Sequence, residues 1–239
     1  MPIPIYLAMT ESEMADCSVL PPRVAWMSCL FSPYGTGLTG IPRKLPPASM
    51  LILSDRIPYF RQNPDLVVSQ LQETMENFGC ESLLLDFQQP DVPELLELVK
   101  RAAAISRKVC VSQCYSEQWR GPILVPPVPL NESAESYLRK WDGREVWLEI
   151  EQTGLQITVT EDGSLYLPMK DNSSEKYPFF YRDLLCHYRQ RINNTAEFYL
   201  KRTQEDHTTL LSLAKGLGVT KAIGFYSEFS TNIDKNFPE

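Results

Sequence analysis

The chain has 239 residues, of which 43% are hydrophobic and 22% charged, and its formal net charge is −7. This length fits a single domain spanning residues 1–239, because α/β barrels of about 250 residues fold as one unit. The acidic balance argues against nucleic acid and anionic membranes as partners, since both need a basic protein surface. No run of about 18 apolar residues is present, so the sequence predicts no membrane-spanning segment.

The cysteines and the first residues together favour a cytoplasmic protein. The six cysteines are scattered without a CxxC pair, which is typical of reduced, buried thiols. The opening segment contains prolines and acids and lacks the basic and apolar parts of a signal peptide.

Apolar runs alternate with helical patterns through the first two thirds of the chain, after an irregular segment expected over residues 1–22. Asn63, Pro64 and Asp65 form a helix start, and Val67 and Leu71 begin the apolar stripe that follows. The expected strands cover residues 23–31, 50–53, 83–85, 108–111, 123–125 and 145–150. The expected helices cover residues 63–78, 93–106 and 133–141.

The pattern changes after residue 150. Asp162-Gly163 lies between two β-rich runs and predicts a hairpin near residues 155–168. Residues 170–176 are polar and predict a loop. Residues 184–191 and 197–202 resemble strands, although the second run also fits a helix. Thr203 and Asp206 resemble a capping box before a helix that ends near residue 217, and residues 221–226 predict the last strand.

This order predicts an α/β fold, a (β/α)₈ barrel with shortened helices and the inserted hairpin. An open, doubly wound sheet is the alternative. No glycine-rich fingerprint of the dinucleotide or P-loop type follows any strand, which weakens that alternative, and no cofactor is predicted.

Polar and aromatic side chains stand at the ends of the expected strands, and in a barrel these ends meet at one mouth. Candidate catalytic residues are Asp86, Glu149 and Glu228. Candidate substrate-binding residues are Tyr34, Asp55, Phe87, Gln88, Gln113, Tyr115, Trp147 and Tyr226, whose aromatic members suit the apolar face of a sugar. The competing interpretation is that strands commonly meet polar residues where they reach the surface, and Glu149 with Glu151 also fits a solvated strand face.

Other common site chemistries find little support. His187 and His207 are the only histidines, and neither has the spacing of a zinc site, so no metal site is predicted. No GxSxG motif accompanies them, which weakens a serine hydrolase.

Residues 80–90, CESLLLDFQQP, resemble the strand motif of the family 18 glycoside hydrolases, the chitinase-like family. Leu83 and Leu85 match its aliphatic positions, Asp86 its last aspartate, Phe87 its aromatic residue and Pro90 its proline. Leu84 replaces the middle aspartate, and Gln88 stands at the position of the catalytic glutamate.

The resemblance implies a barrel with a glycan-binding groove and a substrate-assisted mechanism, in which the glutamate protonates the leaving oxygen. A glutamine amide is not acidic and cannot replace that glutamate. Three hypotheses follow: carbohydrate binding with weak or absent catalysis, an active hydrolase that uses Glu149 or Glu228 as its acid, and a structural or interaction protein.

Overall fold

The computed structural model describes residues 2–56, 62–90, 92–105, 107–169, 176–193 and 195–229. Two compact units make up the chain. We call residues 4–126, 144–149 and 220–229 the barrel unit, and residues 2–3, 127–143 and 150–219 the sheet unit. No helix among the described residues is both long and apolar enough to cross a membrane.

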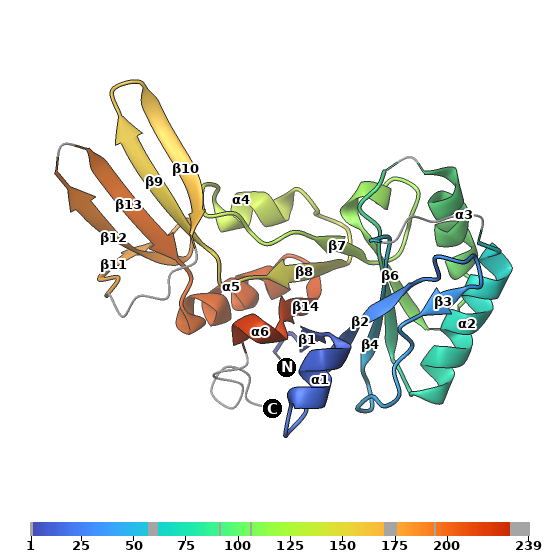
Figure 1. The fold of residues 1–239 in the computed structure, drawn as a ribbon. Helices are drawn as coiled ribbons and strands as arrows, with labels where there is room; N and C mark the ends of the chain where they lie inside the picture. Colours follow the sequence, from blue (N-terminus) through green and yellow to red (C-terminus); the bar gives the residue numbers. More distant parts are fainter. Residues whose placement is uncertain are drawn as a thin grey trace. The chain divides into compact units, whose positions relative to one another are not determined.

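The barrel unit is built on parallel strands that close on themselves, with helices between strands, as the (β/α)₈ prediction requires (Figure 1). In the described residues the ring runs β1-β14-β8-β7-β6-β5-β4-β2 and returns to β1. The strands are β1 (Ile5–Met9), β2 (Val24–Phe31), β4 (Met50–Ser54), β5 (Ser82–Asp86), β6 (Lys108–Ser112), β7 (Ile123–Val125), β8 (Val146–Ile150) and β14 (Val219–Phe225).

Several helices of the barrel unit are short, as the expected barrel with shortened helices allows. Strand β3 (Leu38–Thr39) pairs antiparallel with β2 and occupies the connection to β4. The helices of the barrel unit are α1 (Glu11–Asp16), α2 (Pro64–Asn77), α3 (Pro93–Ala102), the 3₁₀ turn η1 (Gln113–Tyr115) and α6 (Tyr226–Phe229). Helix α2 begins where expected, because the Asn63 side chain accepts a hydrogen bond from the Asp65 N–H.

Strand β1 corrects the prediction that residues 1–22 are irregular. It pairs parallel with β14, where Tyr6 stands opposite Ile223, and with β2, where Ala8 stands opposite Ala25. Tyr226 likewise begins helix α6 and does not extend the last strand.

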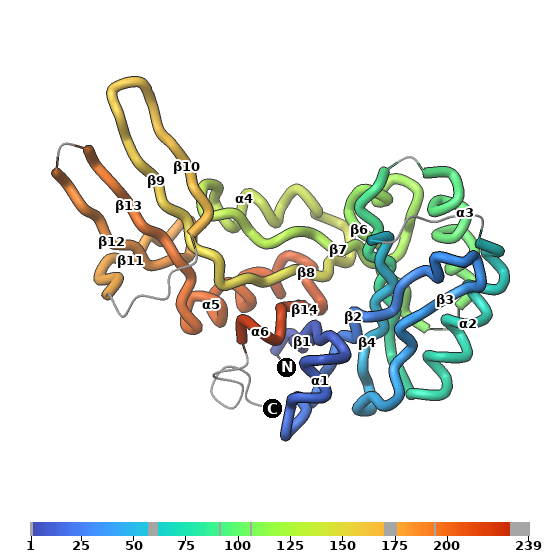
Figure 2. The backbone as a smooth tube through the Cα atoms, viewed as in Figure 1, coloured from blue at the N-terminus to red at the C-terminus, as the bar shows by residue number. Residues whose placement is uncertain are grey.

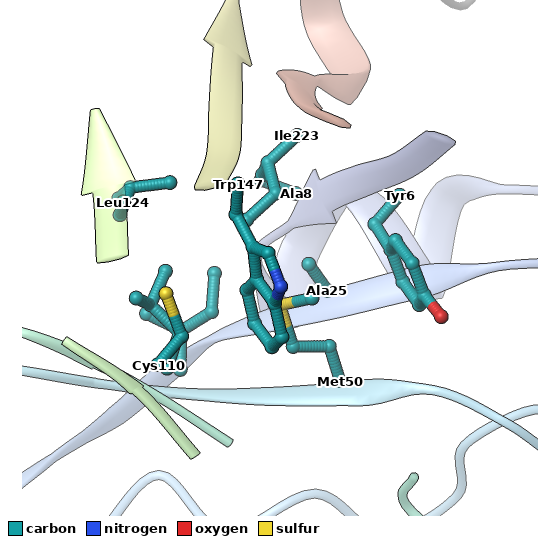
Figure 3. Packing of buried hydrophobic residues seen from close by; sticks show 10 residues of the cluster. Tyr6, Ala8, Ala25, Met50, Cys110, Leu124, Trp147 and Ile223 are labelled. Carbon is teal, nitrogen blue, oxygen red and sulfur yellow. The ribbon is translucent and has the colours of Figure 1, made fainter. Parts of the chain in front are cut away.

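Small and large apolar side chains fill the barrel interior. A buried cluster draws on every strand of the ring, and Trp147 lies among Met50, Ala25 and Cys110 within it (Figure 3). The full cluster is Tyr6, Ala8, Ala25, Met50, Ile52, Leu84, Cys110, Leu124, Trp147 and Ile223. The interior is therefore a packed core, and in barrels of this type functional sites lie at the mouth.

The sheet unit contains an antiparallel sheet of order β10-β9-β13-β12-β11 within the described residues. Its elements are α4 (Ala134–Arg139), β9 (Gly154–Thr160), β10 (Gly163–Met169), β11 (Phe179–Tyr181), β12 (Cys186–Ile192), β13 (Ala196–Lys201) and α5 (Gln204–Gly216). Strands β9 and β10 form the expected hairpin, and residues 196–201 form a strand. Figure 2 follows the chain from β8 into β9 and from β13 through α5 to β14. The loop expected over residues 170–176 lies outside the described residues except for Lys176.

We predict that Leu84→Ala lowers the free energy of unfolding by about 2–5 kcal/mol, because it leaves a cavity in the barrel core. Leu84 is 2% exposed, whereas Val19 is 78% exposed. The control Val19→Ala should change the free energy by no more than about 0.5 kcal/mol. Urea unfolding followed by circular dichroism measures both, and equal effects would contradict this description of the core.

Candidate functional site at the carboxyl end of β5

Asp86 and Gln88 meet at the carboxyl end of β5. Asp86 is the last residue of the strand and is half-buried, whereas Gln88 is exposed. The Gln88 side-chain amide donates a hydrogen bond to Asp86 Oδ1 at 2.5 Å, and the Ser112 hydroxyl donates to the same oxygen at 3.2 Å. The two side chains thus form one hydrogen-bonded pair, as their spacing on the strand predicts.

Asp55, which follows β4 directly, fixes the backbone beyond Asp86. Its Oδ2 atom accepts hydrogen bonds from the N–H groups of Gln88 and Gln89, both at 3.0 Å. The residue is only 5% exposed. The Oδ2 atom of Asp55 therefore binds the protein backbone, and through these two hydrogen bonds Asp55 positions Gln88.

Side chains from other strands also contact residues 86–89 at the end of β5, which we call the tip. Phe87 is fully buried, with its ring centroid 5.9 Å from that of Phe31 and 6.2 Å from that of Tyr115. The Tyr115 hydroxyl donates to the Gln89 carbonyl at 2.6 Å, and the Cys114 thiol donates to the Phe87 carbonyl at 3.0 Å. Phe87 and Tyr115 lie beneath the tip and hold it, and their direct contact with a ligand stays a prediction.

Burial raises the pKa of the Asp86 carboxyl above its ordinary value of 3.8. The hydrogen bonds from Gln88 and Ser112 act in the opposite direction, while the nearby Asp55 carboxylate raises the pKa further and the Arg56 guanidinium lowers it. The effect of burial is the largest of these, so the site disfavours a bare negative charge on Asp86.

Tyr34 projects from a loop after β2 and is 87% exposed. Gln62 holds this loop, since its side chain accepts from the Gly37 N–H at 2.9 Å and donates to the Ser32 carbonyl at 2.5 Å. The Tyr34 ring is thus presented to solvent on an anchored turn, which is a suitable arrangement for stacking against a sugar.

Glu149 lies on β8, two residues beyond Trp147, so the two side chains share one face of the strand. Trp147 belongs to the cluster inside the barrel, so this face is the interior one. Glu149 is half-buried and closer to the carboxyl end of its strand. Alternation therefore directs the Glu149 carboxylate to the interior at the mouth, on the same side as Asp86.

The remaining candidates lie at other strand ends. Gln113 is exposed in η1, directly after β6. Tyr226 and Glu228 lie in α6, after β14, and the Tyr226 hydroxyl is 3.3 Å from the Cys17 sulfur. No group of three His, Cys, Asp or Glu residues in the described part of the chain is placed to hold a metal ion.

Ser112 is the contributor that the sequence analysis missed. It stands two residues after Cys110, which belongs to the interior cluster, so it shares the interior face of β6. That alternation was a usable signal. The parallel register explains the contact, because Leu85 stands opposite Val111 and Asp86 therefore reaches the level of Ser112.

No protein-family model and no curated protein matches this sequence. Solved structures match its fold. A class V chitinase mutant from the plant Cycas revoluta, in complex with (GlcNAc)3, superposes with a TM-score of 0.60 at 11% identity, covering 96% of each chain. This enzyme is a family 18 chitinase. The chain has the fold of the family 18 chitinases.

Two further structures share this fold. The spore cortex-lytic enzyme SleL of Bacillus cereus matches with a TM-score of 0.56 at 8% identity, over 93% of this chain and 70% of SleL. A chitinase-like agglutinin from Robinia pseudoacacia matches with a TM-score of 0.53 at 9% identity, over 92% of this chain and 94% of the agglutinin. The expectation of a chitinase-like barrel, drawn from residues 80–90, is confirmed at the level of fold.

The raised pKa of Asp86 predicts a pH-dependent stability. Between the unfolded and the folded pKa, the folded protein keeps a proton that the unfolded chain has released, so the free energy of unfolding falls as pH rises from about 4 upward. Asp86→Asn removes this decrease in the free energy of unfolding, because asparagine does not titrate. Its free energy of unfolding should therefore rise relative to the wild type as pH increases through the Asp86 pKa.

Urea unfolding at a series of pH values from about 4 to about 7 measures the difference. Ser69→Ala, at an exposed position of α2, is the control and should show no such trend, because it removes no titrating group. A constant difference between Asp86→Asn and wild type across this range would contradict the raised pKa.

Proposed function

We propose that the barrel unit binds carbohydrate at the carboxyl ends of its strands, through Asp86 and Gln88, with weak or no hydrolysis. Asp86 offers a carboxylate and Gln88 an amide, which together supply acceptors and donors for sugar hydroxyl and acetamido groups. Tyr34 supplies an exposed ring for the apolar face of a sugar.

Gln88 carries this proposal. It stands where the chitinase-like motif has its proton-donating glutamate, and its amide is hydrogen-bonded to Asp86. A primary amide has no proton to release near neutral pH, so this residue cannot serve as a general acid. Gln88 can therefore still hydrogen-bond a ligand, but it does not supply the general acid that the glutamate of the motif supplies.

Proteins of the same fold provide support from outside the chain. The Cycas revoluta chitinase holds (GlcNAc)4 in a variant that includes a glutamate-to-glutamine substitution. The Robinia pseudoacacia protein is an agglutinin. Both support a barrel of this kind that binds a glycan.

An active glycoside hydrolase is the second candidate, and the position of Glu149 favours it. This glutamate lies on the interior face of β8 near its carboxyl end, the side of the barrel on which Asp86 also lies. A carboxylic acid there would replace the missing proton donor, with Asp86 as its partner. Glu228 is the other carboxyl group considered for this role.

We also expect the protein to act in the cytoplasm, without nucleic acid or membrane as a partner. The six cysteines are free thiols, and four of them, Cys29, Cys80, Cys110 and Cys186, are buried. Free buried thiols are compatible with a reducing compartment.

We predict that titration calorimetry detects binding of a chito-oligosaccharide such as the tetrasaccharide, and that Asp86→Ala abolishes it. Loss of the carboxylate removes an acceptor and leaves the Gln88 amide without its partner. Glu73→Ala, on the exposed face of α2, should bind as the wild type does. No heat from a broad glycan panel that includes spore-cortex fragments would contradict the proposal and favour a structural or interaction role.

Hydrolysis separates the two candidates. Wild-type protein should release little or no chromophore from an aryl chito-oligosaccharide, whereas Gln88→Glu should release it measurably, because it restores an acid beside Asp86. Adding Asp86→Asn to that variant should remove the new activity. Turnover by the wild type that Glu149→Gln or Glu228→Gln abolishes would instead establish the hydrolase.

A further inference from the structure

The sheet unit has a pocket of about 720 Å³ that the barrel chemistry does not use. Its lining comes from three segments of the unit, namely the residues before β11, the paired strands β12 and β13, and the start of α5. The lining residues are Lys176, Tyr177, Pro178, His187, Lys201, Thr203, Gln204, Glu205 and Thr208. A volume of this size holds a ligand considerably larger than a bare ion.

A carboxylate orients the imidazole in this pocket. His187 Nδ1 lies 3.0 Å and 2.9 Å from the two carboxylate oxygens of Asp206, which is 2% exposed. Asp206 Oδ2 also accepts the Thr203 N–H at 2.8 Å, in the capping box of α5. Because the carboxylate can only accept, Nδ1 donates to it, and Nε2 remains for the pocket. The His187 side chain is 28% exposed, so this edge is accessible.

Positive charge gathers around this imidazole. Lys201 is the direct cross-strand partner of His187, so both side chains lie on the same face of the sheet. The Lys201 ammonium lies 4.3 Å from the centroid of the Tyr177 ring, and the Arg189 guanidinium lies 5.5 Å from the same centroid. Lys176 adds another ammonium to the lining.

The acidic groups only partly offset this charge. The Asp206 carboxylate is buried and hydrogen-bonded to His187 and to the Thr203 N–H. Glu205 is the carboxylate among the lining residues. The Thr203 oxygen accepts the Asp206 N–H at 3.3 Å, a bond that leaves its hydroxyl hydrogen for another acceptor. Two lysines, an oriented imidazole and a hydroxyl thus face one space.

We propose that this pocket binds a phosphate monoester. Lysine is a common ligand of phosphate, and donors arriving from separate segments suit a phosphoryl group with three acceptor oxygens. A doubly charged group also suits two ammonium groups better than a carboxylate does. The remaining volume accommodates the organic part of the ligand, against Tyr177 and Pro178. This site is independent of the function proposed for the barrel.

The two histidines provide a direct measurement. His207 is 5% exposed and burial lowers its pKa to about 4, so its ring stays neutral at neutral pH and provides a reference signal away from the pocket lining. Inorganic phosphate is the probe in a ¹⁵N or ¹³C spectrum of the histidine rings at neutral pH. The His187 signal should shift saturably, and sodium chloride at equal ionic strength should not reproduce the shift.

Matched variants assign the binding groups. Lys201→Gln and Lys176→Gln should each weaken phosphate binding about tenfold or more, since each removes a charge-assisted hydrogen bond. Glu205→Gln should tighten it, because a repelling carboxylate is lost. Lys215→Gln, in the last turn of α5, is the control and should leave the affinity unchanged.

Three results would overturn the proposal. They are a His187 signal that does not respond to phosphate, variants that bind as the wild type does, and acetate binding at least as tightly as phosphate. Calorimetry with the barrel ligand is a separate assay, so failure at one site is distinguishable from failure at the other.

Discussion

The pairing of β1 with both β14 and β2 is the constraint on which the barrel depends. With it the parallel sheet has no open edge between these strands, and each strand contributes to one interior core. Closure also brings the carboxyl ends of all the strands to one rim. Asp55, Asp86 and Ser112 come from the ends of β4, β5 and β6, and the direct parallel pairing of these three strands brings them into a single hydrogen-bonded arrangement.

Much of this fold is predictable because local patterns and tertiary structure agree. Asn63 before Pro64 caps α2, and Asp162-Gly163 turns the β9–β10 hairpin, both as the sequence indicates. Strand β1 was missed because its five residues follow two prolines and show no alternation, so its identity rests on distant partners. The sequence of residues 196–201 fits a helix as well as a strand. Pairing with β12 on one side and β9 on the other makes this segment a strand.

The candidate site was predictable in part. The spacing of Asp86 and Gln88 at the end of an apolar run correctly placed them together. The contacts of Asp55 and Tyr115 were not predictable, since both bind backbone atoms of residues 88 and 89, whose direction depends on the tertiary path of the chain. Residue type suggests ligand contacts for both, and these stay a prediction beside the backbone hydrogen bonds that the structure shows.

For the proposed binding of a glycan, the carboxylate of Asp55 has a consequence for affinity and selectivity. Because Oδ2 holds two successive amides, the backbone that carries Gln88 is ordered before any ligand arrives. Ordering a flexible side chain on binding costs about 0.5–1.5 kcal/mol, and loop ordering adds to that cost. A preorganised tip avoids most of this entropic loss. For the glycan binding proposed above, the same rigidity would narrow the range of ligand shapes that the site accommodates, and the backbone would then contribute to discrimination between similar ligands.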